Sequence, residues 1–141
     1  MPSALPLART RTTHIALALG TVVVGLAVHL TGAGLPPAAR DIVGDALWAA
    51  MMLWWVSALA PDAPLAGRAA VALGICFAVE WSQLHQSPGL DAFRRTRIGH
   101  LLLGSGFDPR DFAAYSAGVL AAAAIDRVVG YGKARRSRPA C

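Results

Sequence analysis

Charged residues are scarce in this chain of 141 residues: they make up 15% of the sequence, whereas hydrophobic residues make up 55%. Soluble domains usually carry about 25% charged residues, and a protein this small has a large surface to cover. The few charges also gather at the two ends and in one middle segment. The composition therefore excludes an ordinary water-soluble domain and predicts an integral membrane protein.

Cysteine is nearly absent as well, because only Cys76 and Cys141 occur. Two cysteines cannot build a disulfide framework, and both are expected to be unpaired. Cys76 lies within an apolar run, where an unpaired cysteine packs as a small hydrophobic side chain.

Several patterns that mark catalytic or nucleotide-binding sites are missing. The sequence contains no HExxH, GxSxG, GxGxxG or Walker pattern. The net charge is +5, but the basic residues are not interleaved with aromatic residues. We therefore expect the basic residues to attract anionic lipids and not nucleic acid. These absences favour a non-enzymatic protein without a metal or cofactor. An intramembrane hydrolase stays open as an alternative, since His29, Glu80, His85 and His100 are candidates to converge on a metal.

Four segments are apolar and long enough to cross a bilayer as helices, which takes about 20 residues. They are Ile15–Gly34, Ile42–Ala60, Leu65–Leu84 and Asp111–Val129. The first is expected to be an uncleaved span and not a secretory signal, because it is long and no small-residue cleavage site precedes the prolines that follow it. The sequence thus predicts an all-α, four-helix transmembrane bundle over residues 14–130, with a basic N-terminus (1–13) and a basic tail (131–141).

The number of spans and the basic residues together predict an orientation. Four spans place both termini on the same side of the membrane. That side holds eight lysines and arginines, against five on the other. The positive-inside rule therefore predicts that both termini are cytoplasmic.

Polar side chains recur near one end of every predicted span, on the side opposite the termini. They are His29 in the first span, Asp45 in the second, Glu80 and Gln83 in the third, and Asp111 and Tyr115 in the fourth. Glu80 and Gln83 are three residues apart and share a helix face. Ionisable residues within a span usually face the bundle and have a partner. The sequence therefore predicts that these side chains form one polar cluster.

The loop after the third span carries three arginines within four residues, Arg94, Arg95 and Arg97. Guanidinium groups bind phosphates and carboxylates with two hydrogen bonds, so these arginines are candidate partners of Glu80. Two interpretations stay open. Ion pairs between these arginines and the carboxylates hold the loop onto the bundle, or the same residues form an outward-facing pocket with an acidic floor and a basic rim.

The second half of this loop, IGHLLLGSGF, is apolar, contains His100, and is too short to span the bilayer. It is expected to be re-entrant or interfacial, because backbone of this kind is tolerated at membrane depth only where protein buries it. Asp108 and Pro109 then have the arrangement of a capping residue followed by a first helical residue. They predict the start of the fourth helix.

Small residues recur at helical spacing on two spans. Ala70, Gly74 and Ala78 do so on the third, and Ala114, Gly118 and Ala122 on the fourth. Such stripes let helices approach closely. They are expected to be packing surfaces.

Four short motifs occur in the order found in a bacterial family of small membrane proteins of unknown function. They are GDALWA (44–49), VEWSQL (79–84), FRRTRIGHLLLGSGF (93–107) and DFAAYSAG (111–118). The chain thus resembles the DUF2809 family and, more distantly, the VanZ-like proteins. The resemblance implies a protein of the bacterial cytoplasmic membrane with a connection to the cell envelope. The family positions fall on Gly44, Asp45, Trp48, Glu80, Gln83, Arg94, Gly99, Gly104, Phe107, Asp111, Tyr115 and Gly118.

The leading functional hypothesis is a non-enzymatic binding site at the outer membrane face. Arg94, supported by Arg95 and Arg97, would engage an anionic lipid headgroup or a cell-envelope intermediate, while Glu80 and other carboxylates orient the arginines. A small transporter or channel in which Glu80 takes up protons is an alternative. A further alternative is that the protein forms a homo-oligomer or is a structural subunit of another membrane protein, because small-residue stripes also bind helices of other chains.

Overall fold

The computed structural model describes the backbone of residues 4–104 and 106–136 and, within these, all side chains except those of residues 4–9, 33, 101 and 130–136. Four helices are long, and two short helices lie between the third and fourth of them. In chain order the elements are α1 (Ala4–Thr31), η1 (Gly32–Gly34, a 3-10 turn), α2 (Pro37–Leu59), α3 (Leu65–Ser82), α4 (Pro88–Arg94), α5 (Arg97–Leu103) and α6 (Pro109–Arg136). No strand occurs in the described part of the chain.

The four long helices contain segments that are long and apolar enough to cross a membrane. These segments are Thr10–Thr31, Pro37–Leu59, Leu65–Ser82 and Pro109–Val129. The predicted all-α fold with four membrane-spanning helices is therefore confirmed. The re-entrant or interfacial position of the loop stays a prediction, although the loop itself is folded into α4 and α5.

The basic segments at the two ends continue the helices next to them. Helix α1 already begins at Ala4, and α6 continues to Arg136, because a helix does not need apolar residues beyond the bilayer core. Residues 1–3 and the end of the predicted tail, residues 137–141 with Cys141, lie outside the described residues. The cytoplasmic location of both ends stays a prediction.

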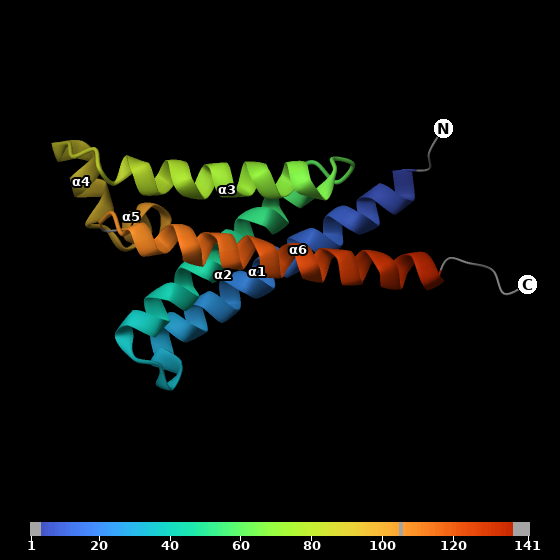
Figure 1. The fold of residues 1–141 in the computed structure, drawn as a ribbon, viewed down its shortest axis with the longest axis horizontal. Coiled ribbons are helices and arrows are strands. Elements are labelled where there is room, and N and C mark those ends of the chain that lie inside the picture. The colour runs from blue at the N-terminus through green and yellow to red at the C-terminus, as the bar shows by residue number, and fades with distance from the viewer. Residues whose placement is uncertain (1–3, 105, 137–141) are drawn as a thin grey trace, which may run out of the picture.

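The α1–α2 hairpin crosses α3 and α6, which run beside each other (Figure 1). The start of α1, the end of α6 and the α2–α3 turn lie at one end of the molecule. The α1–α2 turn and the short helices α4 and α5 lie at the other end. This second end, called the loop face below, is the end at which the sequence predicts the polar cluster.

Helix α2 is the centre of the bundle, because it packs against α1, α3 and α6. The core between these helices consists largely of small side chains: Ala18, Ala49, Leu53, Trp54, Ala72, Cys76, Tyr115, Val119 and Ala122. Large apolar side chains point outward instead, among them Leu19, Val23, Leu30, Leu59, Val71, Leu120 and Val128. Lipid is as apolar as a protein core, so close packing and not apolar burial selects the residues inside.

The small-residue stripe of α6 is a packing surface, as predicted. Ala114, Gly118 and Ala122 are buried, and a Cβ atom at Gly118 would overlap the backbone carbonyl oxygen of Ala46 on α2. The stripe of the third span behaves differently: Ala70, Gly74 and Ala78 are exposed. That stripe does not mediate packing within the chain, because α3 meets α2 and α6 through its other faces.

Replacing Gly118 by alanine should strongly destabilise the bundle. The added methyl group collides with backbone on α2, so the two helices must move apart, at a cost of at least about 2 kcal/mol. Thermal unfolding in detergent micelles measures the effect. Gly74→Ala is the matched control, because its Cβ meets no atom within 4 Å. Equal melting temperatures for the two variants would contradict the close α2–α6 contact.

A second polar cluster lies at the end of the bundle that carries the chain termini. Asp126 on α6 accepts hydrogen bonds from His14 Nε2 (2.7 Å) on α1 and from Arg68 Nη2 (2.9 Å) on α3. The His14 ring stacks on Trp54 of α2, with ring centroids 6.2 Å apart. The sequence analysis missed this cluster, because its members are single residues on separate spans. It ties all four long helices together.

Asp126→Asn should destabilise the protein, because it leaves the buried Arg68 without its negative partner. Removing one member of a buried ion pair costs roughly 3 kcal/mol or more. We expect a clear drop in the temperature of unfolding in micelles. Asp62→Asn, at an exposed position in the α2–α3 turn, provides the control and should leave that temperature unchanged. A similar small effect for both would argue against a structural role for the cluster.

Candidate functional site

Glu80, the only glutamate of the chain, is the most connected polar side chain of the loop face. It is fully buried and accepts hydrogen bonds from the backbone N–H of Asp108 (2.7 Å), the hydroxyl of Tyr115 (3.1 Å) and the Gln83 amide nitrogen (3.3 Å). Because a buried carboxylate is stable only when its oxygens are satisfied, these donors are held in place. Glu80 thereby joins the end of α3 to the start of α6.

The start of α6 is set by local sequence, as predicted. The Asp108 carboxylate accepts a hydrogen bond from the backbone N–H of Arg110 (2.9 Å), and Pro109 is the first helical residue. Asp108 therefore caps the helix with its side chain while its own backbone N–H binds Glu80. Because Asp108 makes both contacts, it fixes the position of α6 relative to α3.

Arg94 has a different partner from the one predicted. Its guanidinium group donates to the backbone carbonyls of Ser82 (2.5 Å) and His85 (3.0 Å) and pairs with Asp91 at 3.3 Å. Glu80 instead takes its hydrogen bonds from neutral donors, so the predicted Glu80–Arg94 pair is wrong. The physical reason is that the carbonyl of Ser82, the last residue of α3, and that of His85 just after it have no partner within a helix, and such carbonyls attract a cation.

A large cavity of about 680 Å³ opens between the helices at the loop face. Its polar lining comes from His29, Arg40, Asp41, Asp45, Gln83, His100, Asp108, Asp111 and Tyr115. Its apolar lining includes Val22, Leu26, Val28, Leu47, Trp48 and Met51. The part of this large cavity near the loop face is therefore mainly polar, while the part further along α1 and α2 is mainly apolar.

Gly104 brings the loop after α5 close to Gln83. Its φ of +65° lies in the left-handed region that favours glycine, and a Cβ atom at this position would lie 2.6 Å from the Gln83 amide nitrogen. A side chain at position 104 would thus be strained and would also push Gln83 away from Glu80. The glycine at this family position is explained by both constraints.

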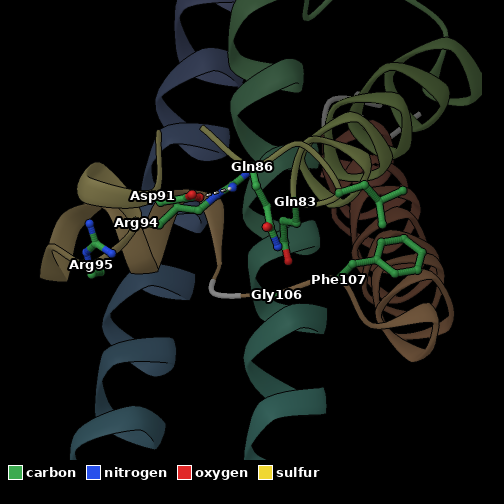
Figure 2. Close-up of a pocket in the computed structure, with 8 residues that line it drawn as sticks. Gln83, Gln86, Asp91, Arg94, Arg95, Gly106 and Phe107 are labelled. Carbon is green, nitrogen blue, oxygen red and sulfur yellow. Dashed lines mark hydrogen bonds and ion pairs between the residues drawn. The ribbon is translucent and has the colours of Figure 1, made fainter. Parts of the chain in front are cut away.

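A small cavity of about 430 Å³ adjoins the end of α3. Its lining consists of Gln83, Leu84, Gln86, Asp91, Arg94, Arg95, Gly106 and Phe107 (Figure 2). Gln83 and Gly106 line both cavities. In Figure 2 the side chains of Gln83 and Gln86 extend toward Gly106, with the Arg94–Asp91 pair beside them, whereas Arg95 points away. Gln83 therefore stands at the boundary between the two cavities.

The structure places most of the predicted site residues at the two cavities. Asp45, Gln83, His100, Asp111 and Tyr115 line the large cavity, and Arg94 and Arg95 line the small one. Glu80 lies beneath both and is bonded to Tyr115 and Gln83. Arg97 is exposed and lines neither cavity.

Two cavity residues were missed by the sequence analysis, Arg40 and Asp41. They precede the predicted second span, which begins at Ile42, and were therefore assigned to a loop. Helix α2 starts earlier, at Pro37, so Asp41 lies one turn before Asp45 on the same face. The helical spacing of these two aspartates was the signal that could have found them.

The chemical groups at the site are suited to binding. Among the described residues no three His, Cys, Asp or Glu side chains are grouped so that they could hold a metal ion. The carboxyl groups of Asp45 and Asp111 lie close together across the α2–α6 contact, with Glu80 nearby. The large cavity thus offers both hydrogen-bond acceptors and the cationic Arg40.

Glu80→Gln should destabilise the loop face. Glutamine keeps the shape but provides one acceptor oxygen in place of two, so at least one of the three donors loses its partner. Hydrogen bonds to a charged group are worth about 1.5–3 kcal/mol each, so we expect a lower temperature of unfolding. Faster hydrogen exchange at the Asp108 amide should accompany it. Unchanged exchange at this amide would contradict the assigned role of Glu80.

Comparison with known proteins places the chain in a family. No solved structure matches the chain. The model of the family described as "Protein of unknown function (DUF2809)" matches residues 34–119, which include α2, α3, both short helices and the first turns of α6. This match covers more than half of the chain and contains the residues of both cavities except those of α1. The chain is therefore a member of the DUF2809 family.

Proposed function

We propose that this protein binds a membrane lipid or lipid-linked cell-envelope intermediate in the large cavity. The ligand would carry a phosphate together with hydrogen-bond-donating groups. The observation that supports this function is the mixed lining of the large cavity, which is mainly polar near the loop face, where α1, α2 and α6 all contribute polar residues, and mainly apolar further along α1 and α2. A ligand that is itself half polar and half apolar fits such a lining.

The apolar side favours a lipid over a water-soluble molecule. Val22, Leu26 and Met51 belong to membrane-spanning segments, where an acyl chain can lie against them. A water-soluble solute would leave this apolar surface uncovered. Pockets for small molecules likewise combine mainly apolar walls with a few placed polar groups.

The charges of the lining favour a headgroup that carries both a phosphate and proton donors. Arg40 is the one arginine of the large cavity and, with His29 and His100, offers donors to a phosphate. Asp45 and Asp111 would repel a bare phosphate but accept hydrogen bonds from hydroxyl or amino groups. A headgroup with both kinds of group satisfies both sides of the lining.

Arg94 does not bind the phosphate in this proposal, because its amino groups are already bound to Ser82, His85 and Asp91. Arg40 takes the phosphate-binding role that the sequence analysis assigned to Arg94. The large cavity opens at the face opposite the chain termini, which is the outer face if both termini are cytoplasmic.

Arg40→Ala should weaken lipid binding without unfolding the bundle. Loss of a charge-assisted contact with a phosphate corresponds to at least about a tenfold loss of affinity. Native mass spectrometry of the protein in detergent with added phosphatidylglycerol measures the retained lipid.

Arg110→Ala is the matched control for this measurement. Arg110 is an exposed arginine near the same membrane face that does not line the large cavity, so its removal should leave lipid retention unchanged. Equal retention by the two variants would contradict the proposal, as would a wild-type protein that retains no phosphatidylglycerol.

A further inference from the structure

Two residues that line the small cavity, Arg94 and Gln83, each carry a buried polar atom without a hydrogen-bond partner among the described residues, Arg94 Nε and Gln83 Oε1. Both residues are only 8% exposed. Buried polar atoms are almost always satisfied, by protein, by water or by a ligand. The two atoms are therefore the unsatisfied groups nearest to the small cavity that a bound polar group would pair with.

The two atoms are of opposite hydrogen-bonding type. Arg94 Nε–H can only donate. The oxygen of Gln83 is the unpaired end of its amide, because the amide nitrogen donates to Glu80 Oε2 (3.3 Å), which fixes the orientation of the amide. A phosphate oxygen would satisfy Arg94 but would meet the Gln83 oxygen as a second acceptor. Hydroxyl groups both accept and donate, so they satisfy both atoms.

The charge around these atoms also favours a neutral group. The positive charge of Arg94 is paired with Asp91 at 3.3 Å. Arg95, the other cation of the small cavity, is exposed and points away from this end (Figure 2). The end of the small cavity next to Gln83 is therefore polar without an unpaired charge, as suits a hydroxylated group.

The small cavity also lies where an extended headgroup would reach. Gln83 and Gly106 line both cavities, so the small cavity continues from the polar part of the large one. A Cβ atom at Gly106 would meet nothing within 4 Å, and the space at this junction is open.

We propose that the small cavity is a specificity subsite that binds the hydroxyl groups of a polyol or sugar headgroup through Arg94 Nε–H and Gln83 Oε1. The phosphate of the same lipid would lie in the large cavity near Arg40. This subsite rests on the headgroup-binding function proposed above and adds the class of ligand: a phosphodiester lipid whose headgroup carries hydroxyl groups.

Two lipids test the subsite directly. Phosphatidylglycerol and phosphatidylethanol carry the same phosphodiester charge, but only the first has hydroxyl groups on its headgroup. In native mass spectrometry with equal amounts of both, the wild-type protein should retain phosphatidylglycerol about tenfold more strongly. Gln83→Met keeps the length of the side chain and removes its amide. It should lower the retention of phosphatidylglycerol to that of phosphatidylethanol.

The outcomes separate this inference from the proposed function. If the wild type binds the two lipids equally, the small cavity does not recognise hydroxyl groups and holds water instead, whereas binding of a phosphate lipid in the large cavity stands. A preference that survives in folded Gln83→Met also overturns the subsite. Retention of neither lipid overturns both proposals. If Gln83→Met does not fold, equal binding of the two lipids by the wild type still overturns the subsite.

Discussion

The hydrogen bonds accepted by Glu80 are the interaction on which the loop face depends. They come from the Asp108 backbone and Tyr115 at the start of α6 and from Gln83 at the end of α3. Within a bilayer an unsatisfied carboxylate is very costly, so the three donors are held together as one unit. Asp108 fixes the start of α6, and Gln83 separates the two cavities. The shape of both cavities therefore follows from the burial of one side chain.

Arg94 complements Glu80 at the end of the same helix. Glu80 binds donors from the start of α6, whereas Arg94 binds the carbonyls of Ser82, at the end of α3, and of His85 just after it, and carries α4 with it. Neither residue has to meet the other, because each satisfies backbone groups that a helix end leaves open. The two charged residues are thus used to assemble the loop face, and Arg40 is the cation left to face the large cavity.

The small residues of the core explain why the carboxyl groups of different helices lie close together. Gly118 lets α6 touch the backbone of Ala46 on α2, which is the residue after Asp45. Asp111 lies two turns before Gly118 on the same helix and is thereby brought close to Asp45. A core of alanine and glycine permits this approach, since larger side chains would keep the helices apart. Close packing of α2 and α6 in the middle of the bundle thus brings the carboxyl groups of Asp45 and Asp111 together at the loop face.

The sequence by itself determined the four spans, the cap of the last helix and the membrane face at which Asp45, Glu80, Asp111 and Tyr115 gather. These features depend on hydropathy, helical spacing and local hydrogen bonding, which can be judged within one segment of the chain. The partners of individual charges were decided only by the tertiary structure. Arg94 binds Asp91 and not Glu80, and the contacts of Asp126 with two other helices were not foreseen. Such pairs depend on which helix faces meet, and this is set by how closely the helices pack and at what angle they cross.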